Sequence, residues 1–361
     1  MASAAEVAAM RRAVELAARG ARTTRPNPTV GAVVLDAKER PVGEGWHERP
    51  GGPHAEVVAL AAAGERARGG TAVVTLEPCA HTGRTGPCVE ALLAAGVRRI
   101  VYAVADPTPQ AAGGADRLRA SGVDVEEGVL AEEAQRVNAR WLVAVRLGRP
   151  YVVWKYAASM DGKVAAADGS SRWITGPLAR ADVHQLRAAS DCIVVGVGTV
   201  LADDPQLTVR ASSSANGAGP GALTPGAQPL RVVVDSHRRT PPGARVCDEA
   251  APTWVATARE VGTGQDGRVD LVALLRRLHG RGAQQVLLEG GPTLAGSFLA
   301  AGLVDRVVGY VAPALLGDGG RSALVGAGAG SIGDAWWLQL EDVARIGDDV
   351  RITARPVARE A

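Results

Sequence analysis

The sequence predicts an α/β protein made of two domains. Strand-like runs alternate with helical patterns along most of the chain, which is typical of a largely parallel sheet between layers of helices. The chain has 361 residues, 47% of them hydrophobic, so it can bury two cores. A helical pattern over residues 131–146 is broken by Gly148-Arg149-Pro150. We therefore expect one domain over residues 1–148 and a second over residues 149–361.

The first domain is expected to form three layers. A helix should open the chain at residues 5–19, because apolar side chains recur there at helical spacing up to Gly20. Strands are expected over residues 32–35, 42–47, 71–76, 100–104 and 123–125, and further helices over residues 115–121 and 131–146. In this order His54 and Cys79 each lie at a strand-to-helix junction.

Three side chains near these junctions have the types and spacing of a zinc site. His54, Cys79 and Cys88 offer one imidazole and two thiolates, which leaves the fourth position of a tetrahedral zinc ion open for a water that ionises near neutral pH. Glu56 follows His54 by two residues, where zinc-dependent nucleobase deaminases have the glutamate that moves protons. His81 competes as a ligand, but a fourth ligand would close the site, so we expect His81 to face the substrate.

Each part of this pattern has a simpler interpretation. A histidine and a glutamate in a first helical turn can reflect capping, and isolated cysteines are usually buried apolar residues. Both parts occur together, however, and a proline directly precedes His54 and Cys79. The combination therefore favours a metal site, although eight residues separate Cys79 from Cys88 where the deaminase pattern has two.

Asn27 is held between two prolines in the loop before the first strand. An asparagine there can close an Asx-turn, or it can bind the edge of a base, and the residues alone leave both open.

The second domain repeats the alternation of strands and helices. Strands are expected over residues 151–156, 193–197, 230–235 and 285–289, with helices over residues 178–189 and 294–301. Residues 211–228 are rich in Ser, Gly, Ala and Pro, which predicts a surface insertion. After the last strand, Gly290-Gly291 either forms a tight turn or lets the pyrophosphate of a dinucleotide approach a helix N-terminus.

Composition narrows the partners. The chain has 40 basic and 38 acidic residues, so neither nucleic acid nor a membrane is expected as a partner, and a small-molecule substrate is favoured. With four cysteines, no secretory signal and no apolar run near 18 residues, we expect a cytoplasmic protein with reduced thiols. Cys192 and Cys247 should then be structural.

These motifs resemble those of the bifunctional deaminase/reductase family of riboflavin biosynthesis, over nearly the whole chain. The first half resembles the deaminase half through Pro26-Asn27-Pro28, His54-Ala55-Glu56, Glu77-Pro78-Cys79 and the eight-residue gap before Cys88. The second half resembles the reductase half through residues 159–162, 173–175, 199–205, 235–236 and 289–294. The resemblance implies a cytidine-deaminase-like fold with zinc, followed by a dihydrofolate-reductase-like α/β domain.

The resemblance also implies two reactions on a phosphoribosylated pyrimidine. Zinc, one ion per chain on His54, Cys79 and Cys88, would serve hydrolytic deamination with Glu56 as the proton carrier, and NADPH would then reduce the ribosyl to a ribityl chain. Cofactor contacts are implied for Ala157, Trp173, Thr199, Asp203, Ser236, Gly291, Pro292, Thr293, Leu294, Ala295, Gly296 and Ser297. Substrate contacts are implied for Ser171, Arg187, Leu207, Arg210 and Glu289.

Three points stay open at this stage. Lys155 or Asp203 can be the proton donor of the reductase, and Lys155 can instead orient the sugar. Ala80, Thr82 and Arg84 stand where the family commonly has Ser, His and Lys, so altered pyrimidine contacts are expected. We expect a homo-oligomer, with residues 307–311 as a candidate interface.

Rival interpretations are weaker. A nucleoside or transfer-RNA base deaminase with an accessory C-terminal domain would need stacking platforms, and only 3% of the residues are aromatic. In a reductase whose N-terminal half bound zinc only as a structural ion, the proton carrier Glu56 would have no function. A non-enzymatic metal scaffold does not explain the second domain.

Overall fold

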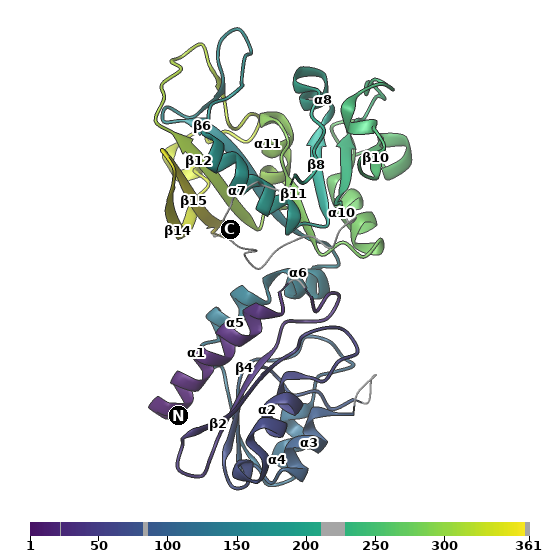
Figure 1. Ribbon diagram of the computed structural model, residues 1–361. Coiled ribbons are helices and arrows are strands. Elements are labelled where there is room, and N and C mark those ends of the chain that lie inside the picture. The colour runs from purple at the N-terminus through teal and green to yellow at the C-terminus, as the bar shows by residue number, and fades with distance from the viewer. Residues whose placement is uncertain (22, 82–85, 211–227, 358–361) are drawn as a thin grey trace. The chain divides into compact units, whose positions relative to one another are not determined.

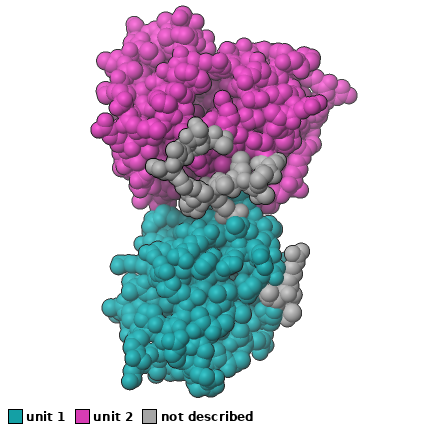
Figure 2. All heavy atoms as spheres, in the orientation of Figure 1, with its two compact units in different colours: residues 1–148 teal, residues 149–361 magenta. Residues whose placement is uncertain are grey.

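The computed structural model describes residues 1–21, 23–81, 86–210 and 228–357. The chain divides into two compact units, Met1–Gly148 and Arg149–Ala361, each with its own sheet and cores (Figures 1 and 2). The predicted insertion at 211–228 lies, except for Gln228, outside the described residues, as do Thr82 and Arg84. No helix within the described ranges is long and apolar enough to cross a bilayer.

Unit 1 has a five-stranded sheet in the order β2-β1-β3-β4-β5. Helices α1, α5 and α6 cover one face and α2, α3 and α4 the other, which makes three layers (Figure 1). The elements are α1 (Ala4–Arg19), β1 (Gly31–Leu35), β2 (Pro41–Trp46), α2 (Ala55–Ala63), η1 (Gly64–Ala67), β3 (Thr71–Leu76), α3 (Cys88–Ala94), β4 (Arg99–Val104), α4 (Gly114–Ala120), β5 (Asp124–Glu127), α5 (Ala131–Val137) and α6 (Ala139–Leu147).

Two expectations for unit 1 need correction. The sheet is mixed, because the β1–β2 hairpin and the β1–β3 pair are antiparallel and only β3, β4 and β5 run parallel. The expected helix over residues 131–146 is broken at Asn138. Its side-chain oxygen accepts from the Thr29 amide at 2.8 Å and its side-chain nitrogen donates to the Thr29 carbonyl at 2.7 Å. These buried bonds tie the break to the loop before β1.

Unit 2 has an eight-stranded sheet in the order β10-β9-β8-β11-β6-β12-β15-β14 and a small β13-β7 sheet. The first six strands of the large sheet are parallel, and the last two form an antiparallel hairpin. The elements are β6 (Tyr151–Ser159), β7 (Lys163–Ala165), α7 (Pro177–Ala188), β8 (Cys192–Gly196), α8 (Val197–Asp203), β9 (Leu230–Val234), η2 (Arg245–Cys247), β10 (Thr253–Ala256), α9 (Ala258–Val261), α10 (Leu271–Gly280), β11 (Gln285–Leu288), α11 (Pro292–Ala300), β12 (Arg306–Ala312), β13 (Arg321–Ser322), η3 (Ile332–Asp334), β14 (Leu338–Ile346) and β15 (Asp349–Pro356).

The expected interface at residues 307–311 is wrong. These residues form β12, which is bonded on one side to β6 and on the other to β15. Val307, Val308 and Tyr310 are buried. A strand with both edges paired and both faces covered has no surface left for a partner.

Candidate functional site

The expected zinc ligands meet in unit 1. His54 is the N-cap of α2, Cys79 follows β3, and Cys88 is the first residue of α3. His54 Nδ1 lies 3.1 Å from Cys88 Sγ and 3.6 Å from Cys79 Sγ. Among the described residues these three form the one candidate metal cluster, with all donor atoms within 4.8 Å of one another. One nitrogen and two soft sulfur donors at this spacing fit a tetrahedral zinc ion with an open fourth position.

The acid and the thiols of this cluster have shifted pKa values. Burial raises the pKa of the Glu56 carboxyl, which faces Cys88 from the first turn of α2. Hydrogen bonds from Cys88 and His54 lower the pKa of the Cys79 thiol. The hydrogen bond to Cys79 and burial raise the pKa of the Cys88 thiol. A thiolate is the form that binds a metal, and Cys79 is the thiol of this pair that the surroundings favour as a thiolate.

His47, the residue after β2, adds a further polar group beside the cluster. Its Nδ1 lies 3.1 Å from the Pro53 carbonyl and its Nε2 lies 3.2 Å from the Asn27 side-chain nitrogen. Because Nδ1 donates to the carbonyl, Nε2 accepts from Asn27. The His47 ring also meets the His54 ring edge to face, with 5.4 Å between centroids. Asn27 and His47 thus form one wall beside the cluster.

A buried carboxylate holds the other side of the metal loop. Glu77 accepts backbone N–H bonds from Asp106, Gly113 and Ala115, at 3.1, 3.1 and 3.0 Å. This ties residues 106–115 to the Glu77-Pro78-Cys79 turn. In the sequence Glu77 was recognised only as part of the Glu77-Pro78-Cys79 motif of the family. Its supporting role was not predicted, because its hydrogen-bond partners lie 29 to 38 residues further along the chain.

His81 is exposed and lies outside the metal cluster, as expected. Ala80 is half-buried, and its amide donates to the Ala111 carbonyl at 3.4 Å.

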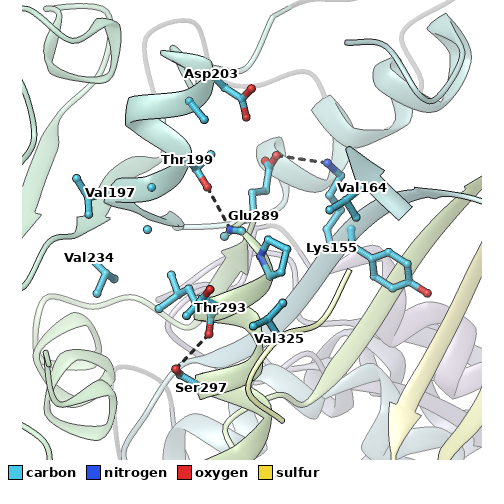
Figure 3. A pocket seen from close by; sticks show the side chains of 18 of the residues that line it. Lys155, Val164, Val197, Thr199, Asp203, Val234, Glu289, Thr293, Ser297 and Val325 are labelled. Atoms are coloured by element: carbon cyan, nitrogen blue, oxygen red, sulfur yellow. Dashed lines mark hydrogen bonds and ion pairs between the residues drawn. The ribbon is translucent and has the colours of Figure 1, made fainter. Parts of the chain in front are cut away.

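Unit 2 contains a cleft of about 2300 Å³ at the carboxyl ends of its parallel strands (Figure 3). Most of the residues expected to contact the cofactor or the substrate of the reductase line it. These are Lys155, Ala157, Ser171, Trp173, Arg187, Thr199, Asp203, Arg210, Ser236, Glu289, Gly291, Pro292, Thr293, Leu294 and Ser297. The cleft is large enough for a dinucleotide and a second ligand together.

A buried charge cluster lies in this cleft. Glu289 follows β11, and its carboxylate accepts two hydrogen bonds from Arg187 of α7. The Nε–Oε1 and Nη2–Oε2 distances are 2.6 and 3.0 Å. Lys155 from the neighbouring strand β6 brings its Nζ to 3.6 Å from Glu289 Oε2 (Figure 3). Burial opposes ionisation of Glu289, but the charges of Arg187 and Lys155 outweigh it and hold its pKa at about 2. Glu289 is therefore an anion, and an acceptor, at neutral pH.

The glycine turn after β11 lets a ligand come close to the backbone at the N-terminus of α11. The Gly291 amide donates to Thr199 Oγ1 at 3.1 Å, which joins the N-terminus of α11 to α8 (Figure 3). Ser297 donates to the Thr293 carbonyl within α11.

Three expected contact residues do not line the cleft. Leu207 packs in the hydrophobic cluster of Ile193, Val195 and Val246, with a left-handed backbone at φ 54°. Ala295 is buried in the core, and Gly296 faces the Val325 carbonyl, which a Cβ there would approach to 1.9 Å. Helical periodicity turns both residues to the inner face of α11.

Several cleft residues were missed by sequence reasoning. The basic ones among them are Arg180, His184, His237, Arg239, Arg268 and Arg321. Arg180 stacks on the exposed ring of Trp173, 4.7 Å from its centroid. In an arginine-rich sequence these side chains carry no local signal, and only the topology brings them to one cleft.

Together, a deaminase-type zinc cluster on one α/β unit and a nucleotide-sized cleft on a second define a bifunctional α/β enzyme. A family model for the cytidine and deoxycytidylate deaminase zinc-binding region matches residues 4–104, and a model of the RibD C-terminal domain matches residues 150–352. The chain therefore belongs to the RibD family, the bifunctional deaminase/reductases of riboflavin biosynthesis. Its cofactors are zinc and NADPH.

Individual relatives agree over nearly the full length. The riboflavin biosynthesis protein RibD of Mycobacterium tuberculosis is 48% identical over 346 residues, covering 96% of each chain. That of Escherichia coli is 45% identical over 357 residues, covering 94% of this chain and 96% of its own.

Two solved structures confirm the expected α/β fold of both halves. Acinetobacter baumannii RibD has a TM-score of 0.81 at 39% identity and covers 98% of this chain and 99% of its own. A Thermotoga maritima diaminohydroxyphosphoribosylaminopyrimidine deaminase/5-amino-6-(5-phosphoribosylamino)uracil reductase has a TM-score of 0.80 at 34% identity, with the same coverage.

Proposed function

We propose that residues 1–148 deaminate 2,5-diamino-6-(5-phosphoribosylamino)pyrimidin-4-one and that residues 149–361 reduce the product to 5-amino-6-(5-phosphoribitylamino)uracil. The observation that carries this proposal is a pair of distinct sites in separate units. One is the His54, Cys79 and Cys88 cluster beside buried Glu56, and the other is the cleft around Glu289.

In the deaminase unit His54, Cys79 and Cys88 hold the zinc ion, which supplies an activated water when bound. Glu56 takes a proton from the water and delivers it to the amino group, so that the water oxygen bonds to the ring carbon, the C–N bond breaks and ammonia leaves. A carboxyl whose pKa is raised by burial suits this exchange of protons. Asn27, fixed by His47, binds the edge of the pyrimidine.

In the reductase unit NADPH supplies the hydride to the anomeric carbon of the ribosyl group. Glu289, an anion, accepts hydrogen bonds from the sugar hydroxyls. Lys155 lies beside Glu289 and donates the proton to the ring oxygen as the sugar opens. Asp203 lies on α8, apart from the Lys155–Glu289 pair (Figure 3), and its carboxylate accepts from Ser171 at 3.3 Å. This arrangement favours Lys155 as the donor.

Arg210 is the better candidate for the ribose phosphate. Arg187 already donates two hydrogen bonds to Glu289 and a third to the Thr208 carbonyl, at 3.1 Å, which leaves it fewer donors for a phosphate. Arg210 is exposed at the cleft, where Arg180 and His184 add further donors. The Arg210 guanidinium has no hydrogen-bond partner among the described residues, and such a guanidinium pairs well with a phosphate.

We also propose a cytoplasmic homo-oligomer without nucleic-acid or membrane partners. Two buried cysteines in a metal cluster suit a reducing compartment. Exposed Leu338, Leu340 and Val343 on the edge strand β14 support an interface between copies.

The test follows both reactions with purified zinc-loaded protein and the diaminopyrimidinone substrate. Ammonia release and NADPH oxidation are measured for the wild type and for Glu56→Gln. We expect the variant to lose ammonia release at least 100-fold but to oxidise NADPH when it is given the deaminated intermediate. A wild type that gives neither signal but deaminates nucleosides or transfer RNA would overturn the proposal.

A further inference from the structure

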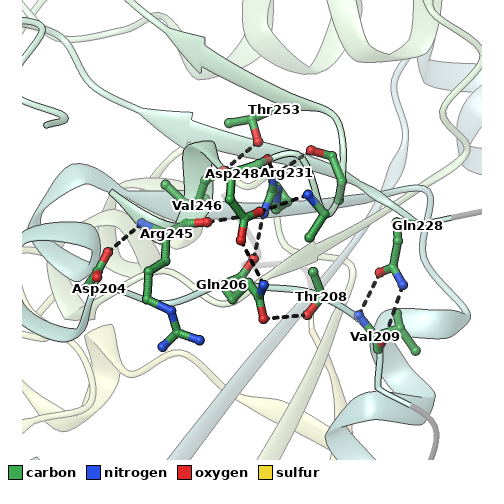
Figure 4. A network of polar contacts seen from close by, with 12 residues as sticks. Asp204, Gln206, Thr208, Val209, Gln228, Arg231, Arg245, Val246, Asp248 and Thr253 are labelled. Atoms are coloured by element: carbon green, nitrogen blue, oxygen red, sulfur yellow. Dashed lines mark hydrogen bonds and ion pairs between the residues drawn. The ribbon is translucent and has the colours of Figure 1, made fainter. Parts of the chain in front are cut away.

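Arg231 is a fully buried charge that lies outside the cleft. It is the second residue of β9, and no part of it is exposed to solvent. Its Nη1 donates to Asp248 Oδ1 at 2.7 Å and to the carbonyls of Gln206 and Arg245 at 3.1 and 3.4 Å. Its Nη2 donates to the carbonyls of Asp248 and Ala251 (Figure 4). One guanidinium therefore gathers backbone groups from two separate loops.

Further bonds join the same two loops. Gln206 Nε2 donates to Asp248 Oδ2 at 2.8 Å, and the Arg245 amide donates to Asp204 Oδ1 at 2.8 Å (Figure 4). Asp204, the C-cap of α8, has a φ angle of 39°, and Leu207 has a φ angle of 54°, in the left-handed region that a bulky residue such as leucine rarely adopts. Contacts from outside must hold such a backbone in place.

The held loop leads directly to the reductase cleft. Asp203 and Arg210, at its two ends, line the cleft. Between them the Thr208 carbonyl accepts from Arg187, which grips Glu289. The Arg210 amide donates to His184 Nδ1 at 3.2 Å. Residues 203–210, named here the 203–210 segment, thus connect the Arg231 network to the charge cluster in the cleft.

A buried ion pair is a poor source of stability, because apolar residues of similar volume often serve as well or better. Its value lies in fixing where its partners stand. Arg231 fixes Gln206, three residues from Asp203 and four from Arg210.

We propose that Arg231, with Asp248 and Gln206, is a positioning group that sets the affinity of the reductase cleft for its pyrimidine substrate without touching it. The inference rests on the reductase function proposed above. The 203–210 segment carries Arg210 and supports Arg187, so its displacement weakens substrate binding. The implied NADPH contacts at the α11 turn lie on another element, and Asp203 is held as the last residue of α8, so NADPH binding is spared.

The test uses the full-length zinc-loaded protein and steady-state reduction of the deaminated intermediate. In Gln206→Ala and Arg231→Lys we expect the KM for the intermediate to rise about tenfold, the factor that 1.4 kcal/mol represents. The KM for NADPH and the ammonia-release rate should stay within about twofold of wild type. Loss of stability alone lowers the active fraction and moves kcat, not one KM.

Arg245→Ala is the matched control, because the exposed Arg245 side chain is not part of the network and only its backbone is. It should keep both KM values. If Arg231→Lys fails to fold, Gln206→Ala decides, since Gln206 is only half-buried. An unchanged KM for the intermediate in the folded variants overturns the inference. A wild type that does not reduce the intermediate would overturn the proposed function instead.

Discussion

Glu77 shows how one residue can support a metal site that it does not enter. Its carboxylate accepts three backbone N–H bonds in a buried setting. In Glu77→Gln one carboxylate oxygen is replaced by an NH2 group, which is a donor and would face backbone N–H groups that also donate. We expect unit 1 to lose about 2 kcal/mol of unfolding free energy, together with faster zinc loss. Urea unfolding and zinc content measure both.

The control for this change is Glu90→Gln on α3. Glu90 pairs with Arg117, but both side chains are about half exposed, at 51% and 50%, so the pair is worth little. Equal effects of the two substitutions would refute a special role for Glu77.

Lys155 is expected to carry the proton in the reductase reaction. Lys155→Met should lower kcat by at least about 100-fold and leave the KM for NADPH nearly unchanged, because a general acid acts on the chemical step. Lys163→Met is the control, since Lys163 does not line the cleft. If Asp203→Asn abolishes turnover while Lys155→Met does not, Asp203 is the donor.

The ionisation of Glu289 predicts a pH dependence of stability. Its pKa is held at about 2, below the value near 4.3 of an unfolded glutamate. The carboxylate therefore contributes stability that is fully present above about pH 4.3 and is lost as the pH falls toward 2. Between pH 5 and 2.5 the free energy of unfolding of unit 2 should fall more steeply with decreasing pH in the wild type than in Glu289→Gln. Parallel curves would contradict the pairing.

Sequence reasoning succeeded at this scale where a motif is local. His54 opens α2 and the two cysteines flank one loop, so residue types and spacing were enough to predict that these three side chains meet. The role of Glu56 stays a prediction. The Arg187–Glu289 pair spans 102 residues. A helix-surface arginine gives no sign of its partner before the order of strands is known, so Arg187 and Glu289 were both expected to contact the substrate but not to pair with each other.

At the scale of elements, the turn after β9 organises a basic edge of the cleft. Asp235 is buried at the end of β9 and accepts from the Thr240 amide and hydroxyl, both at 2.7 Å. The turn between them presents His237 and Arg239 to the cleft, and Arg268 lines it as well. Basic side chains here suit the extra phosphate that distinguishes NADPH from NADH.

Arg239→Ala should therefore raise the KM for NADPH by about tenfold and leave the KM for NADH unchanged, because NADH lacks this phosphate. Arg238→Ala is the matched control in the same turn, because Arg238 lies near Glu260, at 3.7 Å, and does not line the cleft. A similar rise for both cofactors would show that the turn, and not the phosphate, was disturbed.

Strands and helices with clear periodicity were predicted well, including α1, β3, α7 and β11. The break between α5 and α6 was not, because it depends on bonds between Asn138 and Thr29, 109 residues apart. Helix α8 was missed because its seven residues, Val197–Asp203, follow the buried strand β8 without a polar break. The β14–β15 hairpin was missed as well, since β14 is largely exposed and lacks a core-facing pattern.

At the scale of the whole molecule, each unit has its own sheet and its own hydrophobic cores. The sequence anticipated two folds from length and from the break at Gly148-Arg149-Pro150. The pattern of strands and helices alone did not show which residues of the second half converge, because parallel strands bring distant segments to one sheet edge. The family resemblance supplied most of those residues.

Two separate cores predict that metal removal acts on one reaction alone. The candidate zinc ligands His54, Cys79 and Cys88 all lie in unit 1, whereas the described residues that line the cleft of unit 2 all lie between Lys155 and Gly326. Treatment with a chelator should abolish ammonia release and lower the unfolding temperature of unit 1, because bound metal stabilises the folded state. Reduction of the supplied intermediate should persist, with an unchanged KM for NADPH. Restoring zinc should recover ammonia release, and Glu56→Gln, which keeps the ligands, should show the same chelator-induced shift without any activity to recover. Loss of NADPH oxidation on chelation would mean that the two units do not work independently.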